Sequence, residues 1–357
     1  MTICRSDRAD YRALLAALPT LDAGVELILR PTANGATATL RRDDAPPRLF
    51  ATTPAGVVER FPHEDGELSG APLLGDADRL AAAFAPLLGD LEDSRLVAWR
   101  PGRRAVVRLA TTRGVFWLKL LDAKSWRRAA RAFAAVGAPL APLRLATPLA
   151  LRPELCGYVA ASAPGVPLRS LLATGEVAMT TLARSVMALA YTQVAGELPV
   201  LDFQKARAAT LGSLQNALSL RPDLGDLAQR LAALVAVPAP APLGFVHGDL
   251  HDKQIFVDAD GAAVIDLEGM GVGDPRFDVV NLAEHLRLRE RQRGEPDSGR
   301  ADELLSRCGL CPDDAATLAF RAVVRARLCG VYALRPRWTR LVDVLHTEVQ
   351  DLLERLS

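Results

Sequence analysis

The sequence has 357 residues, half of them hydrophobic, and its formal net charge at pH 7 is +1. A chain of this length can bury the cores of two or three packed units, and its balanced charge argues against a nucleic-acid-binding protein. No apolar run reaches the roughly 18 to 20 residues that span a bilayer, and the first residues lack the apolar segment of a secretion signal. We therefore expect a globular, cytoplasmic protein with no nucleic-acid or membrane partner.

The first 92 residues are predicted to form a small unit of their own. Its expected elements are a helix over 11–18 and strands over 25–29, 36–40, 48–51 and 57–61, separated by turn formers. An amphipathic helix is expected to begin near Asp76, with Leu80, Phe84 and Leu87 on one face. We expect this unit to be a cap on the next unit, or an extension of it.

The next segment, 93–165, is predicted to be a small β-rich lobe. The expected elements are strands over 96–99, 105–110, 115–121, 144–151 and 157–161, with a helix over 125–136 after the third strand. Lys119 lies within the otherwise apolar strand VFWLKLL. Burying an ammonium group without an anionic partner is costly, so this lysine is a candidate functional residue.

Residues 166–357 are predicted to be mainly helical, with helices over 168–236, 277–288 and from 302 onward. Between the first two groups lies FVHGDLHDKQIFVDADGAAVID, residues 245–266. It reads as a buried strand, a polar loop over 247–254 and a hairpin that brings the chain back toward that loop.

This arrangement is expected to gather Asp249, Gln254 and Asp266 at one place. A carboxylate in such a loop can accept the proton of an attacking hydroxyl group during phosphoryl transfer. Carboxylate and amide oxygens are also the hard ligands that Mg²⁺ prefers. We therefore predict that Asp249 acts as the base and that Gln254 and Asp266 hold the metal.

The same stretch resembles the aminoglycoside phosphotransferase and choline kinase family, whose loop reads H-G-D-x-H-x-x-N. HGDLH at 247–251 matches this pattern, as do Ile265-Asp266 and the G-D-P-x-x-D segment at 273–278. The family's asparagine is replaced by Gln254, which is one methylene longer. The resemblance implies a two-lobed protein-kinase-like α+β fold, with a small β-rich N-lobe, a mainly helical C-lobe and an N-terminal cap or extension. The implied domains are 1–92, 93–165 and 166–357.

The resemblance also implies where ATP binds. In the kinase template Lys119 contacts the α and β phosphates. Arg103 and Arg104 lie in the turn that covers the nucleotide phosphates in such folds, where they either meet phosphate oxygens or are simply solvated. Backbone groups around Val159 and Ala161 are the candidates for hydrogen bonds to adenine.

Four further residues of the motif carry weaker expectations. His251 either faces the transferring phosphate or the acceptor, or it braces the loop. Glu268 contacts a second metal or the acceptor, or it is an ordinary network carboxylate. His247 is expected to bond backbone beneath the loop, and Asp278 to cap backbone amides or brace the loop.

Together these features predict an ATP- and magnesium-dependent small-molecule O-phosphotransferase. Its acceptor would be a hydroxyl group on a sugar, an amino alcohol or an antibiotic-like compound. Two alternatives remain open, namely a catalytically weak nucleotide-binding regulatory protein and an enzyme that transfers a nucleotidyl group on the same fold.

Five cysteines, an odd number, argue against a disulfide framework in a chain of this length. Cys308 and Cys311 form a C-x-x-C pair, but no second pair or nearby histidine completes a zinc site. We expect this pair to lie in a turn between two helices.

Overall fold

The computed structural model describes residues 8–19, 25–32, 35–42, 45–175, 177–234 and 241–356. The chain forms two compact units, the first β-rich and the second mainly helical. The first unit consists of Met1–Ala130, Pro148–Ser162 and Leu334–Arg337, and the second of Arg131–Thr147, Ala163–Ala333 and Trp338–Ser357. The finer division at residues 92 and 165 stays a prediction.

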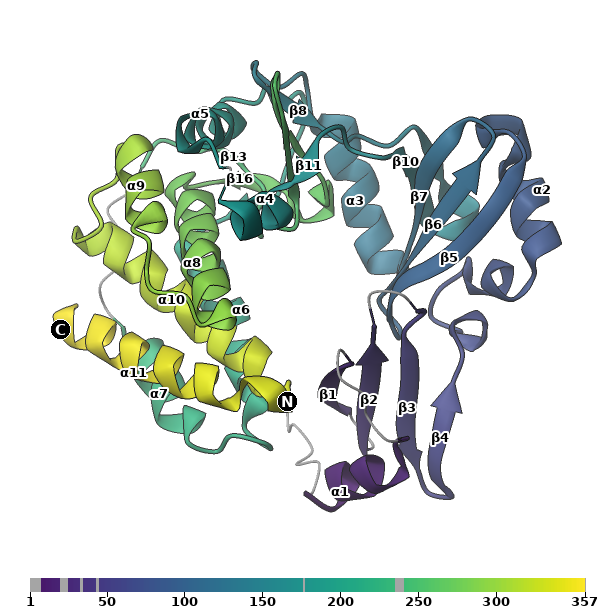
Figure 1. Cartoon of the computed structure of the whole chain (residues 1–357), viewed down its shortest axis with the longest axis horizontal. Coiled ribbons are helices and arrows are strands. Elements are labelled where there is room, and N and C mark those ends of the chain that lie inside the picture. The colour runs from purple at the N-terminus through teal and green to yellow at the C-terminus, as the bar shows by residue number, and fades with distance from the viewer. Residues whose placement is uncertain are drawn as a thin grey trace. The chain divides into compact units, whose positions relative to one another are not determined.

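The first unit begins with a helix and an antiparallel meander (Figure 1). Its elements are α1 (Arg8–Ala17), β1 (Glu26–Thr32), β2 (Gly35–Arg41), β3 (Arg48–Thr53) and β4 (Gly56–Arg60). The four strands pair in chain order, as expected for short strands joined by tight turns. The helix and four strands predicted for this segment are confirmed.

The second sheet of this unit has the strand order β5-β6-β7-β10-β9. Its strands are β5 (Leu91–Arg100), β6 (Arg104–Thr111), β7 (Gly114–Leu121), β9 (Ala150–Arg152) and β10 (Gly157–Ala161). Two helices precede and follow the first three strands, α2 (Ala77–Leu88) and α3 (Ala123–Ala135).

The strand predicted over 144–151 is wrong as a single element. It is divided into β9 of the first unit and β8 (Leu143–Leu145), which belongs to the second unit and pairs in parallel with a strand of that unit. Pro148 lies between the two pieces, and proline cannot donate a ladder hydrogen bond.

The apolar face of α2 packs into the core of the first unit. The side chain of Asp76 caps the helix by accepting a hydrogen bond from Arg79 N at 2.9 Å. Leu80, Phe84 and Leu88 are buried against the sheet, each contributing on the order of 1.5–3 kcal/mol of hydrophobic stabilisation. The predicted face is wrong at its last position, because Leu87 is exposed and Leu88 is buried four residues after Phe84.

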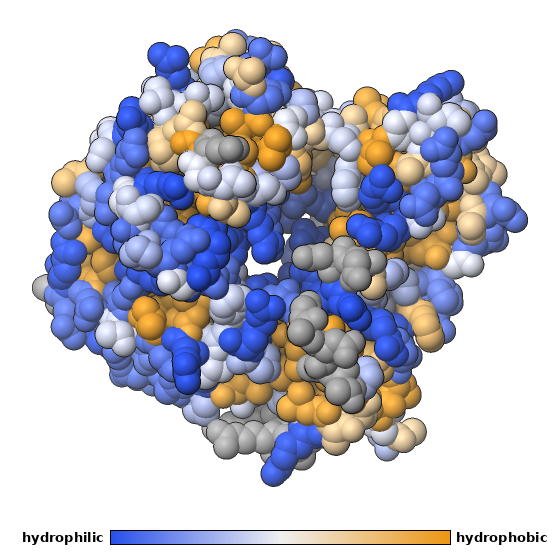
Figure 2. All heavy atoms as spheres, viewed as in Figure 1, coloured by the Kyte–Doolittle hydropathy of each residue, from blue (hydrophilic) through white to orange (hydrophobic). Residues whose placement is uncertain are grey.

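The second unit consists mainly of helices. They are α4 (Leu168–Thr174), α5 (Met179–Ala190), α6 (Phe203–Ala217), α7 (Leu224–Ala232), α8 (Arg276–Arg293), α9 (Arg300–Arg307), α10 (Ala315–Ala333) and α11 (Thr339–Arg355). On the face drawn in Figure 2, the residues over α8 and α9 are mainly hydrophilic. Helices α8 and α11 both pack against α10.

Short strands join these helices in two small sheets. One has the order β11-β14-β15-β8 and the other β12-β16-β13. The strands are β11 (Val166–Pro167), β12 (Val200–Leu201), β13 (Gly244–Val246), β14 (Ile255–Asp258), β15 (Gly261–Val264) and β16 (Gly271–Gly273). The hairpin predicted after the polar loop is confirmed as β14 and β15.

Within the described residues, no helix is both long and apolar enough to cross a membrane. Four of the five cysteines are described, and all four are free thiols, whereas Cys4 lies outside the described residues. Cys308 and Cys311 lie in the turn between α9 and α10, as predicted.

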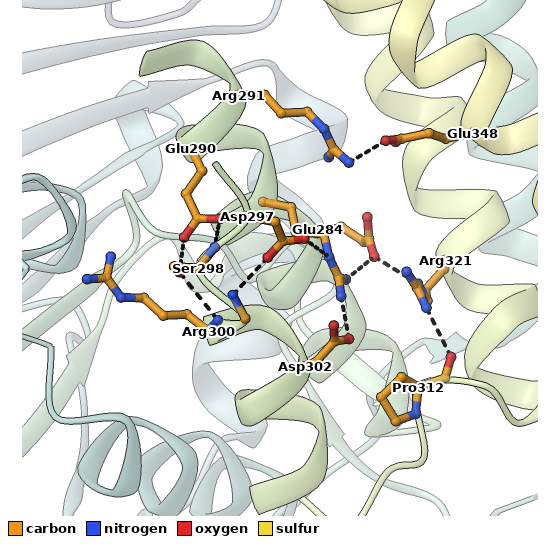
Figure 3. Close-up of polar contacts among 12 residues, drawn as sticks. Glu284, Glu290, Arg291, Asp297, Ser298, Arg300, Asp302, Pro312, Arg321 and Glu348 are labelled. Atoms are coloured by element: carbon orange, nitrogen blue, oxygen red, sulfur yellow. Dashed lines mark hydrogen bonds and ion pairs between the residues drawn. The ribbon is translucent and has the colours of Figure 1, made fainter. Parts of the chain in front are cut away.

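A buried carboxylate joins α8 to α10. Glu284, which is 1% exposed, accepts hydrogen bonds from Arg287 at 3.0 Å and from Arg321 at 3.1 Å. Arg325 binds both of its oxygens. Arg321 continues this network to the carbonyl of Pro312 (Figure 3). Burial raises the pKa of Glu284, but the three guanidinium groups outweigh this effect and lower its pKa from 4.5 to about 2.

We expect Glu284→Gln to destabilise the protein by about 3–5 kcal/mol, because it removes the buried negative charge that Arg287, Arg321 and Arg325 share. Urea unfolding at pH 7 measures this difference. Because the folded-state pKa is lowered, the contribution of Glu284 is complete above pH 4.5 and is lost as the pH falls toward 2. The gap between wild type and variant should therefore narrow over this window.

The matched control is Glu303→Gln, which breaks an exposed pair with Arg307 on one helix. It should cost only about 0.3–0.5 kcal/mol. Equal losses for the two variants would show that the buried network contributes nothing special to stability.

Candidate active site

The backbone of Ile265 holds both ends of the polar loop that follows β13. The ring Nε2 of His247 lies 2.8 Å from the carbonyl oxygen of Ile265. The backbone N–H of Ile265 donates to the carbonyl of Gln254 at 3.0 Å. The loop over 247–254 and the end of the β14–β15 hairpin are therefore adjacent, which places Asp249, Gln254 and Asp266 in one neighbourhood. The contact of His247 with backbone agrees with the sequence-based expectation.

A polar face of α8 lies along the same loop. Asp278 accepts the backbone N–H groups of His247, at 2.5 Å, and Gly248, at 3.0 Å. One turn later, the amide of Asn281 donates to the carbonyl of Leu250 at 2.6 Å. The expectation that Asp278 binds backbone amides of this loop is confirmed.

The next two turns of α8 continue this pattern. The ring of His285 lies 4.8 Å from the ring of His251, centroid to centroid. Arg289 then binds Asp252 through two hydrogen bonds of 2.8 and 2.9 Å. Residues 278, 281, 285 and 289 share a helical face because they are three or four positions apart. They meet residues 247–252 in the same order along the chain.

Asp249 is the most accessible carboxylate of the loop. Its side chain is 52% exposed, and its Oδ1 lies 2.6 Å from Nη2 of Arg327 on α10. The same Nη2 donates to Oδ1 of Asn281 at 3.0 Å. Desolvation raises the pKa of Asp249, but the positive charge of Arg327 and the contribution of His251 outweigh it and lower the pKa on balance.

His251 contacts the backbone of its own loop and lies beside the buried His285. Its Nδ1 accepts the backbone N–H of Lys253 at 3.2 Å. Burial lowers the pKa of His251 to about 4, and burial with the neighbouring positive charges also lowers the pKa of His285 well below 6.5. Among the described residues, neither ring nitrogen of His285 has a hydrogen-bond partner.

Within the described residues, His251, Asp252 and His285 are spaced closely enough to hold a metal ion. However, both oxygens of Asp252 already accept hydrogen bonds from Arg289. The other group of candidate metal ligands consists of Asp266 and Gln254, the predicted magnesium ligands. Asp266 is half-buried at the end of β15, and the Oε1 of the buried Gln254 accepts the N–H of His251 at 3.2 Å.

The donor set of Asp266 and Gln254 fits Mg²⁺ in its chemistry. Both side chains offer hard oxygen atoms, and the amide oxygen of Gln254 keeps one lone pair beyond its bond to His251. The backbone of Asp266 has a φ of 65°, a conformation that asparagine and aspartate tolerate better than other residues with a side chain. Glu268 is buried one turn further on.

The predicted nucleotide-binding residues lie in the first unit. Lys119 is 4% exposed in β7, opposite Val106 of β6 and Tyr158 of β10. Two carboxylates that follow Lys119 in the sequence have contacts of their own. Asp122 caps α3 by accepting the N–H groups of residues 124 and 125, and Glu154 pairs with Arg152.

The β5–β6 turn that contains Arg103 is held by Asp65 of the preceding segment. The Oδ2 of Asp65 accepts the indole N–H of Trp99 and the backbone N–H of Gly102, both at 2.9 Å. Gly102 has a φ of 63°, which favours glycine. Arg103 and Arg104 are both exposed in this turn, and Arg103 lies 3.9 Å from Asp122.

The two backbone candidates for adenine recognition differ in availability. The carbonyl of Val159 accepts the N–H of Leu149 at 2.8 Å. Ala161 is exposed at the end of β10, and the N–H of the following Ser162 bonds Val115 O at 3.3 Å. Ala161 is therefore the better placed of the two for contact with a ligand.

Sequence reasoning missed Asp65, Asn281, His285, Arg289 and Arg327. A signal existed for α8, because Asp278, Asn281, His285 and Arg289 repeat at helical spacing along the helix predicted over 277–288. Arg327 gave no such signal, since only the packing of α10 against α8 brings it to Asp249.

We expect Asp278→Asn to cost about 1–3 kcal/mol of stability, because an amide can accept from only one of the two backbone N–H groups while its own NH₂ faces the other. Amide hydrogen exchange should become faster at His247 and Gly248. Asp313→Asn is the matched control, since Asp313 is 71% exposed. Unchanged exchange at both amides would contradict the bracing role of Asp278.

Comparisons with known proteins place these observations in context. A family model described as the phosphotransferase enzyme family matches residues 95–313. No curated protein sequence matches the chain. Among solved structures, a choline/ethanolamine kinase family protein from Mesorhizobium loti is similar, with a TM-score of 0.50 and 16% sequence identity over 78% of this chain and 98% of that chain.

A thermostable mutant of the aminoglycoside phosphotransferase APH(4)-Ia in its apo form is also similar. Its TM-score is 0.50 and its sequence identity 15%, over 77% of this chain and 98% of that chain. At such identities the likeness concerns the fold. The predicted protein-kinase-like fold, with a β-rich N-terminal part and a helical C-terminal part, is confirmed.

Proposed function

Because this chain belongs to the phosphotransferase enzyme family and is an ATP-dependent enzyme that phosphorylates alcohol groups, we propose that Asp249 is its catalytic base. The observation that carries this assignment is the exposed carboxylate of Asp249 on a loop whose other carboxylate, that of Asp252, is buried and bonded to Arg289. The acceptor is a small hydroxylated molecule, and neither nucleic acid nor a membrane is a partner.

In the proposed reaction the acceptor oxygen attacks the γ-phosphorus of ATP. A bond forms between these two atoms, the bond from the γ-phosphorus to the bridging oxygen breaks, and ADP leaves. Asp249 orients the acceptor hydroxyl and takes its proton, which then passes to solvent. Such catalysis depends mainly on positioning and on stabilising charge, which explains why the loop needs rigid support.

Asp266 and Gln254 are the residues that would hold Mg²⁺. When bound, the ion neutralises negative charge on the β and γ phosphates. The bond between Gln254 Oε1 and His251 N fixes the amide, so that its oxygen keeps one orientation. Glu268 is a further candidate for contact with a metal or with the acceptor, as is His251 for contact with phosphate.

We also propose the nucleotide contacts that the family template implies. Lys119 binds the α and β phosphates, Arg103 and Arg104 meet phosphate oxygens, and backbone around Ala161, with Val159 less available, meets adenine. The cytoplasm, where ATP is abundant, is the proposed location. The division into a cap over 1–92, an N-lobe over 93–165 and a C-lobe over 166–357 remains part of this proposal.

We expect Asp249→Asn to lower turnover by orders of magnitude while ATP binding stays within about twofold of wild type, because the amide cannot accept the proton. ADP release across a panel of alcohols and calorimetry with ATP measure the two quantities. The control is Asp260→Asn in the exposed β14–β15 turn. Wild-type turnover in Asp249→Asn would refute the base.

We expect Asp266→Asn to weaken magnesium-dependent nucleotide binding about tenfold or more, because a neutral amide is a poorer ligand for a hard cation. Titration of ATP with and without Mg²⁺ measures this. Gln254→Asn tests the departure from the family pattern. Activity equal to wild type would mean that the longer amide is tolerated, whereas unchanged metal dependence in Asp266→Asn would remove it from the metal site.

A further inference from the structure

Arg327 has unused hydrogen-bonding capacity beside the proposed base. A guanidinium group carries five N–H donors. In the described structure only Nη2 donates, to Asp249 at 2.6 Å and to Asn281 at 3.0 Å. The three N–H groups on Nε and Nη1 therefore have no protein partner there. The side chain is also 20% exposed, so that a ligand can reach it.

Arg327 is held in place independently of Asp249. Its second partner, Asn281, is fully buried, and the Nδ2 of Asn281 is fixed by the carbonyl of Leu250 at 2.6 Å. This bond directs the oxygen of Asn281 toward Arg327. A ligand can consequently replace Asp249 at the guanidinium while Arg327 keeps its anchor.

The ion pair with Arg327 conflicts with the proposed role of Asp249. It occupies one carboxylate oxygen and lowers the pKa of the group, which makes Asp249 a weaker base. A bound anion at Arg327 would compete for the guanidinium and release the carboxylate. The acceptor must be bound when Asp249 is released, so the acceptor itself is the molecule expected to carry this anion.

The carboxylates on the helices around Arg327 are already occupied. Helix α8 has three acidic residues. Asp278 accepts loop amides, Glu284 binds arginines, and Glu290 accepts the hydroxyl of Ser298 (Figure 3). Helix α10 contains no acidic residue. Neither helix therefore offers an unoccupied counter-charge for a cationic acceptor.

Positive groups converge at the same end of the site. Arg289, Arg327 and Lys253 all contribute to lowering the pKa of His285, whose ring nitrogens are unpartnered. This charge also disfavours a metal cation at the cluster of His251, Asp252 and His285. Because Asp252 already neutralises Arg289, Arg327 is the guanidinium group here whose remaining N–H groups can bind an anion.

On the premise that the proposed function holds, we propose that the acceptor alcohol also carries an oxyanion, a carboxylate or a phosphate, and that Arg327 binds it. The guanidinium fork matches the geometry of both groups, so binding can be bidentate. The anion takes the guanidinium from Asp249, and the freed carboxylate then faces the acceptor hydroxyl. Polycationic acceptors would meet unfavourable charge at this position.

The test uses two sets of alcohols that share a skeleton and differ in charge. One contains glucose, glucosamine, glucuronate and glucose 6-phosphate, and the other glycerol, 3-aminopropane-1,2-diol, glycerate and glycerol 3-phosphate. Phosphorylation gives kcat/KM for each compound. Calorimetry in the presence of Mg²⁺ and a non-hydrolysable ATP analogue gives Kd. We expect an anionic member to exceed its neutral analogue at least tenfold, and the cationic member to be poorest. The glucuronate–glycerate and phosphate arms identify which oxyanion is preferred.

Arg327→Gln should then reduce kcat/KM or binding for the anionic member tenfold or more. It should leave KM for ATP within twofold, because the proposed role of Arg327 concerns the acceptor and not the nucleotide. Arg327→Lys should retain part of the preference, because it keeps the charge without the fork. Arg307→Gln is the matched control, since Arg307 is an exposed arginine paired with Glu303 on α9.

The inference is overturned if the anionic members show no advantage in turnover or binding, or if Arg327→Gln leaves their advantage intact. Thermal unfolding of each variant establishes that it is folded. The proposed function fails in a different way, namely if Asp249→Asn transfers phosphate as fast as wild type. If the protein phosphorylates neutral or cationic alcohols best, the proposed function stands and the proposal of an anionic acceptor is wrong.

Discussion

The geometry of the candidate site depends on the polar face of one buried helix. Asp278, Asn281, His285 and Arg289 of α8 contact the loop over 247–252 in the same order along the chain. Burying so many polar groups is costly unless they are bonded, and the loop supplies hydrogen-bond partners for Asp278, Asn281 and Arg289. Helix and loop therefore stabilise one another, and Asp249 is left as the carboxylate that remains exposed to solvent.

Much of this fold follows from local sequence signals. The strands of the meander, β6, β7 and the β14–β15 hairpin are short apolar runs between turn formers, and each lies close to its predicted position. The errors have tertiary causes. The 144–151 segment is divided because β8 pairs with β15, a partner more than a hundred residues away. Leu88 replaces Leu87 on the buried face of α2, because helical phase is sensitive to one position.

The site was predictable in its motif but not in its surroundings. HGDLH and Ile265-Asp266 identify the loop and the hairpin in the sequence, because the residues that form each motif are adjacent along the chain. The Arg327–Asp249 pair joins residues 78 positions apart, and no periodic pattern connects them. The same holds for Asp65, which reaches the turn at Gly102 from 37 positions earlier. Contacts of this kind depend on how whole elements pack, and residue type alone does not encode them.

The parallel pairing of β8 with β15 determines where the chain can be divided into fragments. The sequence predicts a β-rich lobe that ends at residue 165 and a helical lobe that follows it. On that basis, 166–357 would be the fragment to express alone. Such a fragment would lack Leu143–Leu145 and the bonds from Ala146 N to Val264 O and from Ala262 N to Pro142 O. It would turn β15 into an open edge prone to association with other chains, immediately before Asp266. The helical unit is therefore not contiguous in the sequence, and a truncated gene product would need the 131–147 segment to restore this pairing.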